Sequence, residues 1–131
     1  MARILIADDR EAMRIALKTL FVLRPNWEIC GEAEDGREAV AMATDLQPDV
    51  IVLDFKMPVA NGLQAAYEIG RNLPTTPIVM YTLYKSVQLE SVARSAGVRR
   101  VIAKEDGVQG LLGAIEDELV TKKNAEKSDQ P

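Results

Sequence analysis

The stretch VIVLDFKMPVANG, residues 50–62, joins an unbroken aliphatic run to an acidic residue and a turn. A continuous aliphatic and β-branched run without polar alternation is typical of a strand buried on both faces, as in a parallel sheet. Met57-Pro58 and Asn61-Gly62 are turn signals that end the run, and apolar residues at helical spacing follow Gly62. This segment therefore predicts a buried strand, a loop headed by Asp54, and a helix.

Four other short apolar runs, separated by helical patterns, span residues 3–8, 27–33, 78–82 and 101–104. The run at 27–33 alternates apolar and polar residues, which indicates a strand with one wetter side. Regular alternation of strands and helices predicts a parallel sheet with helices on both faces. We expect an α/β fold of the doubly wound, flavodoxin-like kind, with five strands in the order 2-1-3-4-5 and five helices.

Local signals mark several ends of the expected helices. Asp35, with Glu38 three residues later, forms a capping-box pattern, and Gly97 suits the position just after a helix. Residues 122–131 are polar and patternless, which is typical of a frayed helix end followed by a tail. We therefore expect one domain over residues 1–121 and a polar tail or linker over residues 122–131.

Composition is that of an ordinary globular domain of 131 residues, with 47% hydrophobic residues for a buried core. No apolar run approaches the roughly 20 residues of a membrane span, and the N-terminus lacks a signal peptide's apolar segment, so we expect a cytoplasmic protein. The absence of histidine excludes Ser-His-Asp and Cys-His catalysis, and the single Cys30 excludes an internal disulfide. The net charge of −4 argues against direct nucleic-acid binding by this domain.

Polar side chains stand at one end of four expected strands. Asp8-Asp9 end the first run, Asp54 the third, Thr82 the fourth and Lys104 the fifth. Open parallel sheets bind ligands outside the carboxyl ends of their strands, near the point where the strand order reverses. Three crowded carboxylates repel one another unless cations neutralise them. Lys104 supplies one positive charge, and an all-oxygen cluster suits Mg²⁺ as the other.

Each of these residues also has an ordinary structural explanation, such as a helix cap for Asp9 or a turn for Asp54. Their joint placement on successive strand ends favours a functional site. A carboxylate beside Mg²⁺ acts as a ligand only or as a nucleophile toward phosphorus. Asp54 is the better candidate nucleophile because it ends the middle strand. Thr82 and Lys104 would then contact the phosphoryl oxygens, and the acidic pair would bind the metal.

With these motifs in place, residues 3 to about 121 resemble the receiver domains of response regulators in bacterial two-component systems. The block at 54–62 is similar to the family's phosphoacceptor loop, and the acidic pair, Thr82 and Lys104 match its other site residues. The resemblance implies that a histidine kinase phosphorylates Asp54 with Mg²⁺ as cofactor. It also implies the metal ligands, which are Asp9 directly, Asp8 through water, Asp54, and the backbone carbonyl of Lys56.

Two positions depart from the family pattern. Three residues before the lysine the family usually has Tyr or Phe, which turns inward on activation, and this chain has Val101. Valine has one stiff χ1 and no ring to relocate, so Thr82 must act with a different partner. After Thr82 the family usually has a small residue, and Leu83 here narrows access to the phosphoryl group. Lys56 and Tyr84 occupy positions that often tune dephosphorylation in the family.

The resemblance also implies an output surface on the fourth helix, fifth strand and fifth helix. Arg99 and Arg100 lie beside it, as interface ion pairs or as solvated edge charges. The segment at residues 96–99 is similar to receivers that precede LuxR-type (NarL-type) DNA-binding domains, so we expect control of transcription through an output domain not present in this chain. Apolar residues on the first and fifth helices predict a possible homodimer.

Three other functional classes compete with this switch. A degenerate receiver would bind partners without phosphate, and Val101 and Leu83 favour it. A haloacid dehalogenase-type phosphatase needs a second Asp two residues after the nucleophile, where this chain has Lys56. A flavodoxin-like FMN carrier needs a phosphate cradle in the first loop, where the acidic pair would repel the phosphate. We therefore expect no enzyme beyond a chain that catalyses its own phosphorylation and dephosphorylation.

Overall fold

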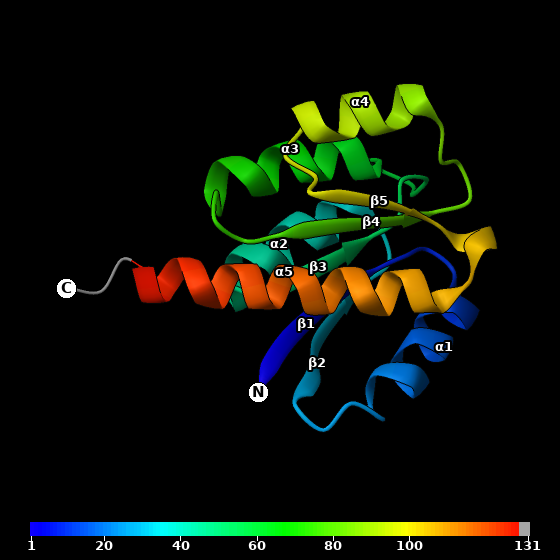
Figure 1. Cartoon of the computed structure of the whole chain (residues 1–131). Coiled ribbons are helices and arrows are strands. Elements are labelled where there is room, and N and C mark those ends of the chain that lie inside the picture. The colour runs from blue at the N-terminus through cyan, green and yellow to red at the C-terminus, as the bar shows by residue number, and fades with distance from the viewer. Residues whose placement is uncertain (129–131) are drawn as a thin grey trace.

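Five parallel strands form one sheet in the computed structural model, which describes residues 1–128. The strands are β1 (Ala2–Ala7), β2 (Trp27–Ala33), β3 (Val50–Leu53), β4 (Ile78–Thr82) and β5 (Arg100–Ala103). Their order across the sheet is β2-β1-β3-β4-β5 (Figure 1), which confirms the predicted order. The strand that carries Asp54 at its end therefore lies in the middle of the sheet, between β1 and β4.

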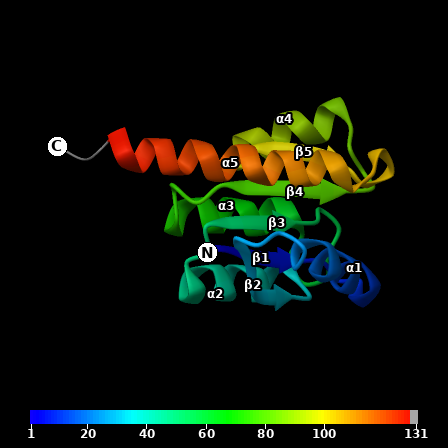
Figure 2. The same ribbon diagram turned by 60° about the horizontal axis from the view of Figure 1, so that its bottom comes forward.

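Helices cover both faces of this sheet. They are α1 (Glu11–Phe21), α2 (Gly36–Leu46), α3 (Gly62–Asn72), α4 (Val87–Ser95) and α5 (Val108–Ser128), with a 3-10 turn at Lys104–Asp106. Helices α1 and α5 lie on one side of the sheet, and α2, α3 and α4 lie on the other (Figures 1 and 2). Side chains of α1 and α5 share one apolar core with the sheet, and those of α2, α3 and α4 share the other. The doubly wound α/β fold is thus confirmed. Within residues 1–128, no helix is long and apolar enough to cross a membrane.

Alternate residues of the middle strand serve the two cores. Ile51 and Leu53 pack with α2, α3 and α4, whereas Val50 and Val52 pack with α1 and α5, and all four are at most 2% exposed. A strand sends successive side chains to opposite faces, so a strand buried on both sides needs an unbroken aliphatic run. The run ends at Leu53, and the next residue, Asp54, lies just beyond the carboxyl end of this central strand.

The helix ends follow their local signals with one difference. Asp35 caps α2 by accepting a hydrogen bond from the Glu38 backbone N–H at 2.8 Å. The full reciprocal capping box lies at α3, between Asn61 and Gln64, where we had not predicted one. Gly97 has a φ of +101° just after α4, which confirms it as the residue that ends this helix.

Helix α5 is longer than predicted. We expected fraying near residue 121, but the helix continues to Ser128 and its end extends past the sheet in Figure 1. Residues 121–128 contain no glycine or proline, and Lys122 Nζ lies 3.6 Å from the Asp49 carboxylate. Propagating a nucleated helix requires no apolar pattern, which explains why a patternless segment stays helical. Residues 129–131, the rest of the predicted tail, lie outside the described residues.

Val59, in the loop after β3, has a φ of +68° and is 78% exposed. A β-branched residue in this region is strained by about 1–3 kcal/mol, whereas asparagine tolerates it. We expect Val59→Asn to raise the free energy of unfolding by about 1 kcal/mol and the melting temperature by roughly 3–5 °C. Thermal denaturation measures both. Val87→Asn is the matched control, since Val87 is also 78% exposed but lies at the start of α4. Equal shifts in the two variants would exclude relief of strain.

Candidate functional site

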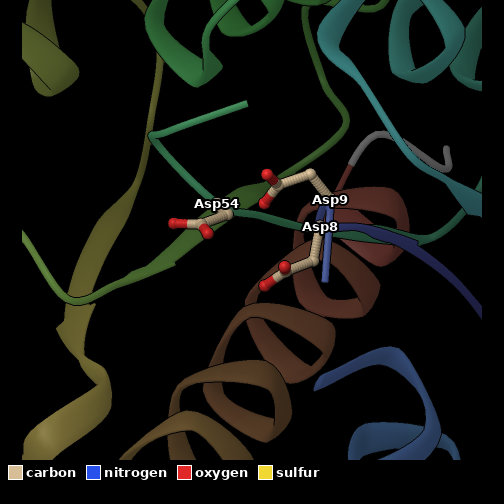
Figure 3. Close-up of side chains that lie close together, drawn as sticks. All are labelled: Asp8, Asp9 and Asp54. Carbon is tan, nitrogen blue, oxygen red and sulfur yellow. The ribbon is translucent and has the colours of Figure 1, made fainter. Parts of the chain in front are cut away.

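One edge of the sheet brings four of the predicted site residues together. Asp8 and Asp54 directly follow β1 and β3, and Lys104 directly follows β5. Carboxylate oxygens of Asp8, Asp9 and Asp54 all lie within 4.8 Å of one another. Figure 3 shows these three side chains close together, from the end of β1 and the end of β3. Asp8 and Asp54 are buried and Asp9 is exposed, so the cluster opens to solvent on the Asp9 side.

The ammonium group of Lys104 joins the two buried carboxylates. Lys104 Nζ lies 2.8 Å from Asp8 Oδ2 and 3.1 Å from Asp54 Oδ2, and its side chain is only 4% exposed. Burial alone would lower the pKa of Lys104, but its hydrogen bond to Asp8 and the charges of Asp54 and Asp8 raise the pKa above its usual range. The lysine is therefore held in its charged form.

The surroundings of Asp54, unlike those of Lys104, disfavour its charged form. Burial raises the pKa of Asp54, the charge of Lys104 counteracts part of that rise, and the charge of Asp8 adds to it. The ionised carboxylate of Asp54 is thus only partly compensated by the surrounding protein. A further positive charge at this edge would stabilise it.

Backbone N–H groups fix the orientation of both buried carboxylates. The Phe55 N–H donates to Asp54 Oδ1 at 2.7 Å, and the Arg10 N–H donates to Asp8 Oδ1 at 2.8 Å. Each carboxylate therefore has one oxygen on the backbone and the other on Lys104. Short hydrogen bonds of this kind hold reactive groups in place before a ligand arrives.

Arg14 is a supporting residue that sequence reasoning missed. It is 7% exposed on α1, and its guanidinium donates to the Asp8 backbone carbonyl at 2.7 Å. Glu32 at 3.3 Å and Glu34 at 3.4 Å neutralise it. A signal was present in the sequence, because Arg14 falls beside Leu17 and Phe21 on the apolar face of the expected helix. A lone charge on such a face needs a buried partner.

A pocket of about 200 Å³ lies over the carboxylate cluster. Its lining residues are Asp9, Arg10, Asp54, Lys56, Leu83, Tyr84 and Lys104. Leu83 thus lies at the pocket, where we expected it to narrow access. Thr82 lies at the end of β4 and is fully buried, and its Oγ1 accepts a hydrogen bond from the Tyr84 N–H at 3.2 Å. Among residues 1–128, no hydrogen bond joins the threonine hydroxyl to Asp8, Asp9, Asp54 or Lys104.

The donor set of this edge fits a hard divalent cation. Three carboxylates face one ammonium group, and the chain has no histidine to favour a softer metal. Mg²⁺ prefers oxygen ligands and takes only one or two carboxylates directly, keeping water for the remainder. An exposed carboxylate beside two oriented, buried ones provides such a set.

Comparison with known proteins agrees with this geometry. The family model described as response regulator receiver domain matches residues 4–116. The chain is 38% identical over 114 residues to the transcriptional regulatory protein PdtaR of Mycobacterium tuberculosis, covering 87% of this chain and 55% of that protein. It is 30% identical over 115 residues to the transcriptional regulatory protein LnrK of Bacillus subtilis, covering 88% and 52%. The chain thus spans about half the length of these curated relatives.

Solved structures show the same architecture. A LuxR-family two-component response regulator from Aurantimonas superposes with a TM-score of 0.88 at 27% identity, covering 92% of this chain and 86% of that one. The response regulator domain of CheB from Thermotoga maritima superposes with a TM-score of 0.82 at 29% identity, covering 95% and 97%. With a family match over most of its length and the acidic cluster at the strand ends, this chain belongs to the response regulator receiver domain family.

Proposed function

We propose that Asp54 accepts a phosphoryl group from the phosphohistidine of a sensor kinase and that this modification switches the domain's affinity for a partner. The observation that carries the proposal is the oriented Asp54 carboxylate, which lines an open pocket and has Lys104 Nζ at 3.1 Å. A carboxylate oxygen attacks phosphorus, the P–N bond to the kinase imidazole breaks, and an acyl phosphate forms. We expect this to take place in the cytoplasm.

The chain's own residues provide positioning and charge for this transfer. Lys104, held charged between two carboxylates, can neutralise an oxygen of the incoming phosphoryl group. Thr82 can turn its hydroxyl toward the same group, because a threonine Oγ has more than one staggered position. Phosphoryl transfer depends mainly on positioning and electrostatics, so a site of this kind needs no further general base.

Asp8, Asp9, Asp54 and the backbone carbonyl of Lys56 would hold Mg²⁺. A bound Mg²⁺ neutralises the charge that develops on the phosphoryl oxygens. Asp9 is the exposed member of the cluster and is suited to bind the ion directly, while Asp8, engaged by Lys104 and a backbone N–H, is suited to bind through water.

The partner surface of the switch lies on α4, β5 and α5. Arg100 contacts Asp117 and Glu118 of α5 at 3.3 Å each, and Arg99 contacts Glu118 at 3.5 Å. Both arginines form ion pairs with α5, so a partner protein that binds either of them would have to replace these ion pairs. A phosphorylated site favours an active conformer that already exists at low population. Two curated relatives are transcriptional regulatory proteins, which supports control of transcription, and we propose that a DNA-binding output domain outside these residues would exert it.

The competing function is a degenerate receiver that binds its partner without phosphate. The observations in its favour are Leu83 at the pocket and Val101, which is buried in the core of α2, α3 and α4 and has no ring to move. One experiment separates the two functions.

Incubation with Mg²⁺ and acetyl phosphate should add one phosphoryl group to the intact protein, measured by mass spectrometry. Asp54→Asn should abolish the added mass, since the amide cannot form an acyl phosphate. A chelator should abolish it in the wild type. Retention of the label in Asp54→Asn would contradict the assignment of Asp54. Absence of label in the wild type, together with failure to bind beryllofluoride, would establish the degenerate receiver.

The exposed face of α1 is the surface we propose for the kinase. Apart from Glu11 at its N-terminal end, it is an uncharged stripe that continues just past the helix, and its uncharged members are all exposed: Ala12, Ile15, Ala16, Thr19, Val22 and Leu23. Ile15, Val22 and Leu23 are 51%, 73% and 75% exposed. An uncharged stripe at helical spacing suits packing against other helices.

Val22→Glu should lower phosphotransfer from a purified histidine kinase that labels the wild type by about tenfold, since a buried charge replaces an apolar contact. Labelling by acetyl phosphate should be unchanged. Val120→Glu, at a 59% exposed position on α5, is the matched control. Unchanged kinase transfer in Val22→Glu would exclude this face. If light scattering instead showed a dimer that Val22→Glu dissociates, the stripe would bind a second copy of the domain.

A further inference from the structure

Asp9, the exposed member of the carboxylate cluster, is held in place only through its neighbours in the chain. Its carboxylate takes no hydrogen bond within residues 1–128, whereas Asp8 is bonded at both side-chain oxygens. Asp9 also lies between the end of β1 at Ala7 and the start of α1 at Glu11, so neither a strand nor a helix fixes its backbone. The direction of its carboxylate therefore depends on the peptide groups on either side of it.

Each of these two peptide groups is held by one hydrogen bond to a side chain. The group after Asp9 is held at the Arg10 N–H, which donates to Asp8 Oδ1 at 2.8 Å. The group before Asp9 is held at the Asp8 carbonyl, which accepts a hydrogen bond from Arg14 Nη1 at 2.7 Å. The atoms of a peptide group lie in one plane. The guanidinium that fixes this carbonyl therefore also fixes the N–H and Cα of Asp9.

The guanidinium of Arg14 is itself fixed in one orientation. Arg14 is 7% exposed, and its Nε and Nη2 lie 3.3 Å from Glu32 and 3.4 Å from Glu34. Each of its three nitrogens thus has an acceptor of its own, and a planar guanidinium bonded at three points cannot turn freely. Lys18, one turn along α1, binds the other oxygen of Glu32 at 2.8 Å.

We propose that Arg14 is a positioning residue of the metal site, which aims the Asp9 carboxylate at the ion through the peptide group between Asp8 and Asp9. The inference rests on the proposed function, in which Asp9 binds Mg²⁺ directly, and extends it to a residue of α1. Mg²⁺ demands near-ideal octahedral geometry, so a small rotation of that peptide group weakens binding. Loss of a residue that orients a metal ligand typically lowers metal affinity by about 10- to 100-fold.

The charge of Arg14 by itself predicts the opposite effect on metal binding. A guanidinium beside the cluster repels a divalent cation, so Arg14→Met would strengthen binding if Arg14 acted only through its charge. Loss of positioning weakens binding instead. We expect Arg14→Met to raise the Kd for Mn²⁺ about tenfold. Mn²⁺ takes the same oxygen ligands as Mg²⁺, and electron paramagnetic resonance measures the ion that remains free.

Lys18→Met is the matched control. It removes one positive charge from α1 and from the same carboxylate, Glu32, but it leaves Arg14 bonded to the Asp8 carbonyl. Because the Lys18 side chain is 41% exposed and its charge is screened, the Kd for Mn²⁺ should stay within about twofold of the wild type. An equal loss of affinity in the two variants would assign the effect to the ion pairs of Glu32 and refute the proposal.

A double-mutant cycle tests whether Arg14 acts through Asp9. Asp9→Ala removes the direct ligand and should weaken Mn²⁺ binding by itself. Adding Arg14→Met to Asp9→Ala should change the Kd by less than about twofold, because no carboxylate remains at this position for Arg14 to aim. A general disturbance of the fold would add its full loss in either background, and that result would contradict the role of Arg14.

Circular dichroism establishes that each variant is folded. Arg14→Lys replaces Arg14→Met if the latter does not fold, since lysine keeps the charge but has no planar fork for three acceptors. Its Kd for Mn²⁺ should rise by at least about threefold. Wild-type affinity in a folded Arg14→Met protein, or in Arg14→Lys when Arg14→Met is unfolded, would overturn the proposal.

Failure of the proposed function would give a different set of results. A wild type that binds Mn²⁺ no better than Asp9→Ala and takes no label from acetyl phosphate would overturn the proposed function, and the role of Arg14 with it. A wild type that is labelled, together with a folded Arg14→Met protein of unchanged Mn²⁺ affinity, would overturn only the role of Arg14.

Discussion

Replacing Lys104 with methionine should lower the free energy of unfolding at pH 7 by about 3 kcal/mol, because it leaves two buried carboxylates without a counter-charge. Asp8 and Asp54 are 3% and 6% exposed, and each has one oxygen bonded to Lys104 Nζ. Methionine is similar in length, so little packing is lost. Denaturant unfolding of the two proteins measures the difference. The variant should also lose most labelling by acetyl phosphate, since no ammonium group faces the phosphoryl oxygens.

A double-mutant cycle and the pH dependence test the electrostatic cause. Adding Asp54→Asn to Lys104→Met should restore at least 1 kcal/mol, because one uncompensated charge is removed. Burial already raises the pKa of Asp54 above its unfolded value, and loss of Lys104 raises it further. A raised carboxyl pKa means that the folded state binds more protons than the unfolded state, so stability increases as pH falls from the folded pKa toward about 4. The deficit of Lys104→Met should therefore shrink on acidification. A deficit that is independent of pH would indicate lost packing instead.

In the wild type, the stability that Lys104 contributes should be lost at high pH. The pKa of Lys104 is raised by its bonds to Asp8 and Asp54 despite burial, so its contribution is fully present below the unfolded lysine pKa. It is lost as pH rises through the folded pKa of Lys104. Lys104→Met has no such group, and the stability difference between the two proteins should fall in strongly alkaline solution.

Replacing Gly62 with alanine should destabilise the domain by about 3 kcal/mol and displace the phosphoacceptor. A Cβ at this first residue of α3 would lie 2.2 Å from the Asp54 backbone oxygen and 2.9 Å from Phe55 Cα. Both are backbone atoms, which cannot move aside as a flexible side chain would. The loop after β3 must shift, and Asp54 with it, so labelling by acetyl phosphate should fall together with the melting temperature.

Gly113→Ala is the matched control for this prediction. Gly113 lies within α5, and an added Cβ there meets no atom within 4 Å. Alanine is favoured over glycine inside a helix, so this variant should gain roughly 0.5–1 kcal/mol and keep its labelling rate. A Gly62→Ala protein as stable as the wild type would show that α3 can move away from Asp54, and the close approach would then have no structural role.

The amino-acid sequence alone predicts the strands, the order of the sheet and the gathering of four charged residues at one end of it. Val50–Leu53 must be buried on both sides because it contains no polar alternation, and that requires helices on both faces. Once the strands are parallel, their carboxyl ends share one edge, and the residues after them must gather there. Asp8, Asp9, Asp54 and Lys104 meet for this reason alone.

The partner that each polar side chain of the site takes was decided only by the tertiary structure. The Lys104 ammonium bridges carboxylates from β1 and β3, and Arg14 reaches back from α1 to the Asp8 carbonyl. The Thr82 hydroxyl accepts a hydrogen bond from the Tyr84 N–H, whereas the sequence predicted only that Thr82 ends the fourth strand. Local patterns report which face of an element is apolar, but not which rotamer a side chain takes or which acceptor it finds. The length of α5 was likewise hidden, because a polar segment carries no hydrophobic period to mark where its helix ends.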